Sequence, residues 1–398
     1  MPDRRVLVVT TAEKGHANPM AGVVQWLRRE GARVGWLAVP EASPQLRALA
    51  DEVFEPLAAL PRPELVTGGE ELARLVRDRV RLRAWLKALL VDGVEAQLPA
   101  VREAIRGFRP DAVATDPMLY QAVLAAHLEG IPFGGISSSL NPVTPEELEA
   151  DHLDNVRSHA AERDALFLRH GLAPRFRVCD FLSPSFTTVF ATRAYAGDVE
   201  VPDGVRLVGP SLPPEARGDE VPFPWERLPD GKPVVYVSFG SQIWYQPELF
   251  RKVADAAAPL GVTVVLNAGG LAGEDWPAHV VAVPYAPQLA LLPRVSVLVT
   301  HAGANSVMEA LAHGVPVLAS PVCNDQPLQT WFLERSGAGR RVDLASAPVE
   351  ATRDALAALL SEGSPCRAAA RRIRDDYGRH DGAREAARLV LGLAGGPA

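Results

Sequence analysis

The sequence predicts an α/β protein in which two doubly wound parallel sheets face each other across a cleft. First, the chain has 398 residues, which is more than a single hydrophobic core usually supports. Second, short valine-rich runs alternate with segments of helical spacing in the first half, and the alternation restarts in the second half. Third, a proline-rich stretch at residues 210–233 separates the two halves.

The first half carries the repeated strand and helix signals of a parallel sheet. Apolar runs bounded by charged or turn residues predict strands at residues 6–10, 34–39, 111–115 and 131–136. Helical spacing of apolar residues predicts helices at residues 20–29 and 118–128. Repeated strand–helix–strand units require a parallel sheet that helices cover on both faces. Residues 140–179 are polar and helical in pattern.

The second half repeats the pattern and sets the expected domain limits. Strands are predicted at residues 234–239, 262–266, 279–283, 295–300 and 315–320. After Pro348 the chain is helical in pattern almost to its end. We therefore expect an N-terminal domain at 1–212, a linker at 213–232 and a C-terminal domain at 233–375. The remaining segment, 376–398, is expected to form a helix that packs back on the N-terminal domain.

Composition and charge disfavour several classes of protein. The formal net charge of -7 argues against nucleic acid as the partner, since nucleic-acid binders need a basic face. Cys179, Cys323 and Cys366 show no C-x-x-C spacing, so neither a disulfide framework nor a zinc site is indicated. The apolar run at 6–10 is too short for a signal peptide, and no run approaches a transmembrane helix. We expect a cytoplasmic protein without stable membrane insertion.

Small and polar residues follow two neighbouring strands of the second half. After the strand at 295–300 come His301, Gly303, Ala304, Asn305, Ser306 and Glu309, and after the next strand come Asp325 and Gln326. Small residues before a helix let a phosphate group approach backbone amides, and the helix dipole favours its charge. The glycines alone are better explained by a tight turn. The whole set favours a site in which His301 meets phosphate, Glu309 meets ribose, and Asp325 with Gln326 meets sugar hydroxyls.

These residues resemble the donor-binding signature of family 1 glycosyltransferases, the enzymes that use UDP-sugars. The resemblance is carried by residues 285–288, by Glu309, and by the unbroken spacing from His301 to Gln326. It implies the GT-B fold, two Rossmann-like domains, for essentially the whole chain. Between Gln288 and His301 the chain is slightly shorter than the plant form of the signature, so it resembles bacterial members that act in natural-product pathways.

The resemblance implies a role for each matching residue. His301 would hold the diphosphate, with Gly303, Asn305 and Ser306 around it. Gln288 and Glu309 would bind the ribose, while Asp325 and Gln326 would hold hexose hydroxyls. The glycine and serine at 240–241, after the strand at 234–239, resemble the second phosphate loop of the family; these two residues are Gly240 and Ser241.

Two positions depart from the family pattern and bear on the donor. Tyr285 stands where the family often has a tryptophan that stacks on the base, although a tyrosine ring also stacks. Ala304 stands where plant members carry tryptophan, so contacts around the hexose would differ. Asp325 with Gln326 resembles the pair of glucose users. Thymidine-diphosphate deoxysugar enzymes often have a Gly-Thr sequence at 305–306. The resemblance therefore favours UDP and a fully hydroxylated hexose such as glucose.

A histidine follows the first predicted strand. We expect Asn18 and Pro19 to cap and begin the next helix, which would put His16 just before a helix N-terminus. There the helix dipole would keep the imidazole neutral, as a base requires. A lone histidine at a strand end is more often structural. The G-H-x-x-P run that starts at Gly15 nevertheless matches the family, in which this histidine deprotonates the acceptor hydroxyl.

An aspartate follows the strand at 111–115, at the same edge of the sheet. By resemblance, Asp116 would hydrogen-bond His16 and stabilise its charged ring. The alternative is a capping aspartate before Pro117.

Together these features imply an inverting hexosyltransferase of the UDP-glycosyltransferase type. It would move a hexose, glucose first, from a UDP-sugar to a hydroxyl of a small hydrophobic natural product such as an antibiotic precursor. We expect no cofactor and no metal, because the sequence lacks a suitable D-x-D motif and the leaving charge would be met by His301, Ser306, Ser241 and the helix dipole. We expect a monomer or a homodimer. The acceptor would contact residues 75–90 and 141–170.

Several alternatives remain open at this point. The nearest is a thymidine-diphosphate deoxysugar transferase. A nucleotide-sugar epimerase would not need His16 and Asp116, and a non-catalytic auxiliary protein would be expected to lack His16 and His301. The residues at 244–245 either line the cleft or serve as a packing plug. The other histidines, including His127, His152, His159 and His170, are interpreted as surface or structural residues.

Overall fold

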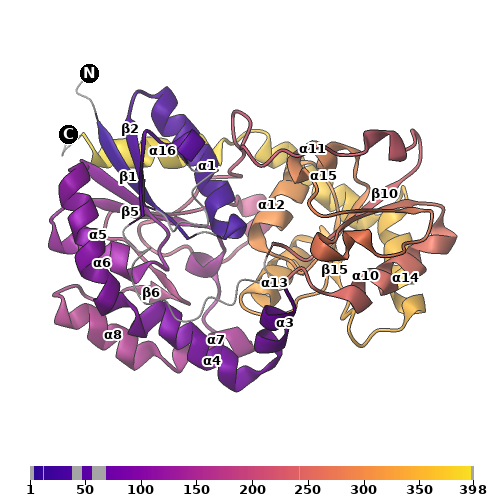
Figure 1. The fold of residues 1–398 in the computed structure, drawn as a ribbon, viewed down its shortest axis with the longest axis horizontal. Helices are drawn as coiled ribbons and strands as arrows, with labels where there is room; N and C mark the ends of the chain where they lie inside the picture. The colour runs from indigo at the N-terminus through magenta and orange to yellow at the C-terminus, as the bar shows by residue number, and fades with distance from the viewer. Residues whose placement is uncertain (1–3, 12, 38–46, 56–68, 242, 396–398) are drawn as a thin grey trace.

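The computed structural model describes residues 4–11, 13–37, 47–55, 69–241 and 243–395. These residues form two α/β halves that lie side by side along the long axis of the molecule (Figure 1). Each half is built around its own parallel sheet. The predicted fold class is confirmed, and the residues predicted as the end of the second strand, 38–39, lie outside the described residues.

The N-terminal half contains a seven-stranded parallel sheet in the order β3-β2-β1-β4-β5-β8-β9. Its strands are β1 (Arg5–Val9), β2 (Arg33–Leu37), β3 (Glu52–Phe54), β4 (Ala112–Thr115), β5 (Phe133–Ser137), β8 (Phe186–Val189) and β9 (Val205–Leu207). Val9 pairs with Leu37 and with Thr115. The chain segments after β1 and β4 therefore leave the sheet at the same edge, which is where parallel α/β sheets carry their sites.

Helices cover this sheet on both faces, as its apolar strands require. The helices of this half are α1 (Lys14–Arg29), α3 (Gly69–Arg77), α4 (Arg79–Lys87), α5 (Val94–Phe108), α6 (Tyr120–Leu128), α7 (Asp151–Arg157), α8 (Ala160–Arg169) and α9 (Arg193–Ala196). Of these, α1, α5 and α6 contact strands of the sheet. A small antiparallel pair, β6 (Phe176–Arg177) and β7 (Asp180–Phe181), lies between α8 and β8 along the chain.

The C-terminal half contains a six-stranded parallel sheet in the order β12-β11-β10-β13-β14-β15. Its strands are β10 (Val234–Ser238), β11 (Thr263–Asn267), β12 (Val280–Val283), β13 (Val297–Thr300), β14 (Val317–Ala319) and β15 (Gly339–Arg341). Its helices are α10 (Pro247–Ala257), α11 (Gln288–Leu291), α12 (Ala304–Ala312), α13 (Gln326–Ser336), α14 (Val349–Leu360) and α15 (Pro365–Tyr377). Thr300 pairs with Ser238 and with Ala319, so the loops after β10, β13 and β14 share one edge.

The last helix, α16 (Gly382–Leu393), returns to the N-terminal half and lies against α1 (Figure 1). Its approach depends on glycine, because a Cβ on Gly22 of α1 would lie 3.1 Å from Ala383 Cβ. A Cβ on Gly382 would lie 2.1 Å from the carbonyl oxygen of Gly209. One hydrophobic cluster accordingly contains residues of both halves, including Val24 of α1, Val307 of α12 and Ala387 of α16.

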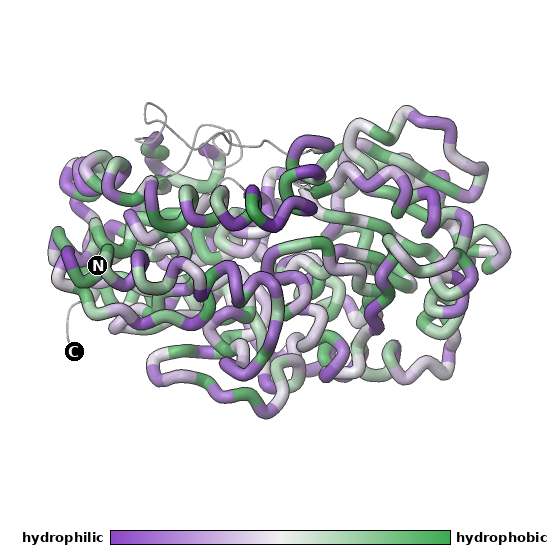
Figure 2. Tube along the Cα trace, turned by 90° about the horizontal axis from the view of Figure 1, so that it is seen from below, coloured by the Kyte–Doolittle hydropathy of each residue, from purple (hydrophilic) through white to green (hydrophobic). Residues whose placement is uncertain are grey.

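Hydrophilic and hydrophobic residues alternate along the outer helices (Figure 2), as expected for helices that bury one face. Within the described ranges, no helix is long and apolar enough to cross a membrane.

Candidate active site

His16 and Asp116 meet at the edge where β1 and β4 end. The Nδ1 atom of His16 lies 2.5 Å from Oδ2 of Asp116, and the two side chains are 26% and 3% exposed. The other carboxylate oxygen of Asp116 accepts from the backbone N–H of Met118 at 3.0 Å. Asp116 is thus fixed and shielded from solvent, while the ring of His16 keeps an exposed part. A proton on Nδ1 that is donated to Asp116 leaves the lone pair on Nε2 for a ligand.

The sequence-based position of the helix start was wrong. The helix α1 begins at Lys14, because the carbonyl oxygen of Glu13 accepts from the backbone N–H groups of His16 and Ala17 at 2.9 Å. His16 therefore lies in the first turn of the helix, and Asn18 and Pro19 lie inside it.

The expected neutral ring is also wrong for the ligand-free protein. Burial lowers the pKa of His16, but the charge of Asp116 and its hydrogen bond outweigh burial and raise this pKa to about 9. A carboxylate at hydrogen-bonding distance favours the imidazolium more than the positive end of a helix dipole opposes it.

Two further polar residues support this pair, and neither was singled out from the sequence. The hydroxyl of Ser138 lies 2.9 Å from Nδ1 of His16. The loop that carries Ser138 is held at both ends by Asp180, which accepts from Ser137 Oγ at 2.5 Å and from Asn141 Nδ2 at 2.8 Å. Burial raises the pKa of Asp180 to about 7, and the nearby charge of Asp116 adds to this effect. No local pattern marked these residues, because each acts through a partner far away in the sequence.

His301 lies directly after β13, between two glycines. A Cβ on Gly303 would lie 2.6 Å from Nε2 of His301, and a Cβ on Gly240 would lie 2.9 Å from Cε1. Gly240 also has a φ of +80°, which disfavours any other residue. Burial lowers the pKa of His301 to about 4, so its ring is neutral near pH 7. Ser241 is exposed beside Gly240.

The helix α12 begins at Ala304, with Gly303 at the N-cap. Asn305 and Ser306 thus lie in its first turn, where unpaired backbone N–H groups and the helix dipole favour an anion. The structure brings His301, Gly240 and this helix start together, as the predicted phosphate site would require.

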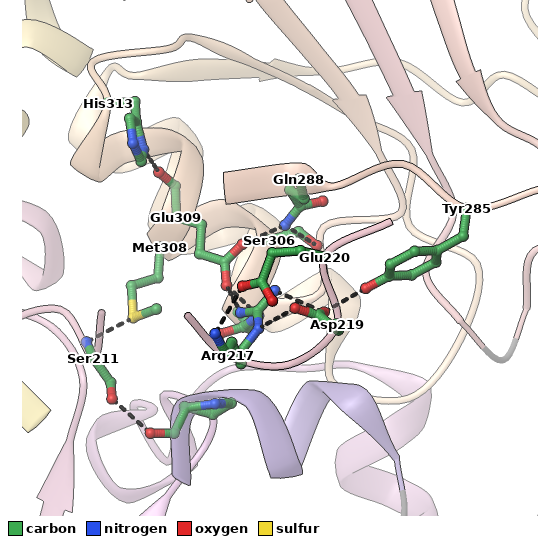
Figure 3. Close-up of polar contacts among 12 residues, drawn as sticks. Ser211, Arg217, Asp219, Glu220, Tyr285, Gln288, Ser306, Met308, Glu309 and His313 are labelled. Carbon is green, nitrogen blue, oxygen red and sulfur yellow. Dashed lines mark hydrogen bonds and ion pairs between the residues drawn. The ribbon is translucent and has the colours of Figure 1, made fainter. Parts of the chain in front are cut away.

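The predicted ribose residues form one polar cluster with the linker (Figure 3). The carboxylate of Glu309, which is 1% exposed, accepts from Arg217 Nη1 at 2.7 Å. It also accepts from Gln288 Nε2 at 2.6 Å and from Asn305 Nδ2 at 2.9 Å. In the ligand-free protein the carboxylate of Glu309 therefore already has three hydrogen-bond partners from its own chain. No sequence pattern indicated Arg217, which lies in the predicted linker.

Asp219 and Lys14 contact Tyr285, which is predicted to stack on the nucleotide base of the donor. The hydroxyl of Tyr285 donates to Asp219 Oδ2 at 2.6 Å (Figure 3). The ammonium group of Lys14 lies 3.6 Å from the centre of the Tyr285 ring. Burial lowers the pKa of Lys14, although the charge of Asp219 opposes this effect. Because Lys14 follows β1 and Tyr285 follows β12, the carboxyl ends of the two sheets face each other.

Asp325 and Gln326, predicted to hold the hexose, differ in their surroundings. The side-chain oxygen of Gln326 accepts from the backbone N–H groups of Val322 and Cys323, at 2.8 and 2.9 Å. Gln326 is buried and stabilises its own loop. Asp325 is half-buried, and its Oδ2 accepts from Gln329 Nε2 at 3.1 Å. Of the two residues, Asp325 is the more available to a ligand.

The aromatic pair after β10 is half-buried and packs against the C-terminal half. A Cβ on Gly269 would lie 2.5 Å from the ring of Trp244, and Trp244 and Tyr245 pack against the hydrophobic cluster of that half. Of the two interpretations, the packing plug is therefore the better one. In the part of the chain that the structure describes, no group of three or more His, Cys, Asp or Glu residues is arranged to hold a metal ion.

Comparisons with known proteins agree with this geometry. The family model described as UDP-glucoronosyl and UDP-glucosyl transferase matches residues 229–368. Demethyllactenocin mycarosyltransferase of Streptomyces fradiae is 30% identical over 77% of this chain and 68% of its own length. The 4'-demethylrebeccamycin synthase of Lentzea aerocolonigenes is 27% identical over 98% of this chain and 99% of its own.

Among solved structures, the glycosyltransferase of kitacinnamycin is 25% identical and superposes with a TM-score of 0.80, over 99% of this chain and 100% of its own. The calicheamicin glycosyltransferase CalG4 gives a TM-score of 0.73 at 22% identity, covering 100% of both chains. The chain therefore belongs to the UDP-glucoronosyl and UDP-glucosyl transferase family, as a GT-B glycosyltransferase of the bacterial natural-product type.

Proposed function

We propose that the protein transfers a hexose, glucose first, from UDP to a hydroxyl group of a small hydrophobic natural product. The transfer inverts the anomeric configuration and needs no metal ion. The observation that carries the proposal is the pairing of His16 with the buried Asp116, opposite a neutral His301 between two glycines. The pair of His16 and Asp116 suits proton removal, and His301 with its two glycines suits a diphosphate.

In the proposed reaction, Nε2 of His16 removes the proton from the acceptor hydroxyl. The acceptor oxygen forms a bond to the anomeric carbon, and the bond from that carbon to the diphosphate oxygen breaks. Asp116 stabilises the imidazolium that forms. The backbone N–H groups at the start of α12, together with His301, Ser306 and Ser241, stabilise the charge on the leaving diphosphate. Because the pKa of His16 is about 9 before substrate binds, only the deprotonated fraction starts this reaction.

In the same proposal, Tyr285 stacks on the base, Gln288 and Glu309 bind the ribose, and Asp325 binds the hexose. The ribose then replaces Arg217 as a partner of Glu309. We further propose that residues 1–212 form the acceptor domain and 233–375 the donor domain. The linker at 213–232 and the returning segment at 376–398 connect them. A cytoplasmic location and a monomeric or homodimeric state belong to the same proposal.

A thymidine-diphosphate deoxysugar is the second candidate donor. Its support is that one relative is named as a mycarosyltransferase and that a structural neighbour is a complex with thymidine diphosphate. Relatives named as glucosyltransferases, including a zeaxanthin glucosyltransferase, support UDP-glucose. Asp325 favours a donor that carries hydroxyls, because a carboxylate left without a hydroxyl partner weakens binding.

Isothermal titration calorimetry in the presence of EDTA tests the proposal. The ligands are UDP, UDP-glucose, thymidine diphosphate and a thymidine-diphosphate deoxysugar. We expect the uridine ligands to bind more tightly than the thymidine ligands. Tighter binding of the thymidine ligands would move the enzyme to deoxysugar transfer, and binding of none would contradict the transferase proposal.

A further inference from the structure

Asp180, on β7, is a second buried carboxylate close to the proposed base. The residue is 1% exposed, and the proposed reaction does not use it. In the described part of the chain, its hydrogen-bond partners are the uncharged side chains of Ser137, Asn141 and Cys179. A carboxylate buried among uncharged groups costs free energy, so its presence calls for an explanation.

The carboxylate of Asp180 holds both ends of the segment 137–141. Its Oδ2 atom accepts from Ser137 Oγ at 2.5 Å, and its Oδ1 atom accepts from Asn141 Nδ2 at 2.8 Å. Within the segment, the backbone N–H of Ser139 donates to Ser137 Oγ at 3.3 Å, and the backbone N–H of Asn141 donates to Ser139 Oγ at 3.1 Å. These contacts close the segment into a loop that Asp180 completes.

Ser138 lies in the middle of this segment and contacts the proposed base. Its hydroxyl oxygen is 2.9 Å from Nδ1 of His16, the same nitrogen that Asp116 contacts at 2.5 Å. Asp116 follows β4 and Ser138 follows β5, and these two strands are neighbours in the sheet. A contact with one group at Nδ1 leaves the ring free to turn about that contact, whereas groups from two strands fix its plane. The plane of the ring sets the direction in which Nε2 points.

We propose that Asp180 is a positioning residue for His16. By holding the segment 137–141, Asp180 keeps Ser138 against the ring, so that Nε2 points towards the acceptor hydroxyl. Catalysis is sensitive to such orientation, because a small misplacement of a reacting group lowers the rate strongly. Asp180 acts through Ser138 and does not contact the substrate. The inference rests on the proposed function, in which His16 is the base.

A carboxylate suits this task because both of its oxygens accept hydrogen bonds. Burial raises the pKa of Asp180 to about 7 and the charge of Asp116 adds to this rise, while the hydrogen bonds from Ser137 and Asn141 oppose it. The two ends of the segment therefore stabilise the ionised form that accepts from both of them.

Two substitutions at position 180 differ in whether they keep the segment closed. In Asp180→Asn, the amide oxygen would accept from Asn141 and the amide nitrogen would donate to Ser137 Oγ. The hydroxyl of Ser137 would then donate to the carbonyl oxygen of Ser139, which lies 3.2 Å away. Asp180→Leu removes both contacts and keeps a side chain of similar size.

The order parameter of the Cε1–H bond of His16, measured by ¹³C relaxation in the ligand-free protein, tests the assignment. We expect about 0.85 in the wild type, the value of a rigid group, and less than about 0.6 in Asp180→Leu and Ser138→Ala. Asp180→Asn should recover most of this loss. Ser137→Ala, which removes only one end of the contact, should give an intermediate value and tests the proposal if Asp180→Leu does not fold. An unchanged order parameter in the folded variants would overturn the proposal.

Transfer of glucose from UDP-glucose to the fluorescent phenol 4-methylumbelliferone measures the consequence for the reaction. In Ser138→Ala and in Asp180→Leu, kcat should fall about tenfold, as misorientation of a reacting group predicts, and the affinity for UDP should not change. Because Asp180 acts through Ser138, the double variant should lose no more than the single variants. Multiplied losses of about 100-fold would show independent effects and overturn the route through Ser138.

Ser183→Ala is the matched control for loss of a buried hydroxyl. Ser183 is 2% exposed and donates to the carbonyl oxygen of Phe133 at 2.6 Å. Its substitution should lower the melting temperature about as much as Ser137→Ala does, while the order parameter of His16 and kcat should not change. Equal loss of order at His16 in both variants would assign Asp180 a general structural role and overturn the proposal.

The outcomes also separate this inference from the proposed function. If the wild type binds UDP-glucose and the order parameter of His16 is the same in all variants, the inference fails while the proposed function stands. If the wild type binds neither UDP nor UDP-glucose, the proposed function fails, and this inference fails with it. If the wild type binds UDP-glucose but transfers nothing to the phenol, the order parameters alone decide whether Asp180 positions His16.

Discussion

His16 and His301 occupy similar places in the two halves of the molecule, yet their surroundings push their charge in opposite directions. Each follows a parallel strand and lies at or just before a helix start. His16 has a buried carboxylate 2.5 Å away, which raises its pKa to about 9. His301 has glycines against its ring, and burial lowers its pKa to about 4.

The difference shows that the partner, not the position in the fold, decides what a histidine can do. Burial disfavours the charged ring in both places. At His16 the charge and hydrogen bond of Asp116 are the largest influences that reverse this effect, which makes His16 a strong proton acceptor once it is deprotonated. His301 stays neutral and can donate one hydrogen bond to a phosphate oxygen without a titration near pH 7.

The largest expected effect separates the two histidines by function. His16→Ala should lower kcat by about 10³-fold, since general base catalysis contributes on this scale, and the affinity for UDP should not change. His301→Ala should mainly weaken UDP binding. Steady-state kinetics and calorimetry on both variants check this. Loss of UDP binding in His16→Ala with full binding in His301→Ala would reverse the assignment.

The next substitution removes the negative charge of Asp116, which distinguishes the surroundings of His16 from those of His301. Asp116→Asn should lower kcat by about 100-fold, because the imidazolium that forms is no longer stabilised. In the wild type, kcat/KM should rise with pH and level off above pH 9. In the variant, burial lowers the pKa of His16 and is opposed only by the smaller influences of Glu13 and Asp325. The pH at which kcat/KM levels off should therefore be lower than in the wild type.

A matched control for this profile is Ser138→Ala. This substitution removes an uncharged partner of the same ring nitrogen. The pH at which kcat/KM levels off should therefore stay near the wild-type value. Equal profiles for Asp116→Asn and the wild type would contradict the role of Asp116.

A smaller effect is expected from the glycine next to His301. Gly303→Ala places a Cβ 2.6 Å from Nε2 of His301, so the ring must move and UDP binding should weaken about tenfold, as overpacking costs suggest. Gly15→Ala is the control next to the other histidine, since a Cβ there meets nothing within 4 Å. Calorimetry with UDP compares them, and equal affinities would contradict the tight phosphate site.

The smallest effect concerns stability against pH, where the two histidines should act with opposite sign. The raised pKa of His16 stabilises the fold below about pH 6.5, its unfolded value, and this contribution is lost as pH rises towards 9. The lowered pKa of His301 means that its contribution is present above about pH 6.5 and is lost as pH falls towards 4.

Melting temperatures between pH 4 and pH 9 test these signs. His16→Ala should flatten the alkaline side of the profile, and His301→Ala should flatten the acidic side. Flattening on the same side by both variants would rule out the opposite signs.

Local sequence signals predicted the strands and the residues that follow them. His16, Asp116, His301 and Asp325 each come after a strand of a parallel sheet, so the fold itself brings them to facing edges. The predicted strands match the observed ones within a few residues. β3, β8, β9 and β15 carried no distinct pattern because they are short or partly polar.

Contacts between distant segments could not be predicted in this way. Arg217 and Glu309 lie 92 positions apart in the chain, and Ser138 and His16 lie 122 apart. The pKa of His16 was mispredicted for the same reason, because only the structure shows how short its contact with Asp116 is.

The most direct test of the account is a titration of the imidazole signals of His16 and His301 by NMR in the ligand-free protein. Signals are assigned by comparison with His16→Ala and His301→Ala. We expect one pKa near 9 for His16 and one near 4 for His301. Two values close to 6.5, or the same two values exchanged between the residues, would contradict the division of roles proposed for the two halves.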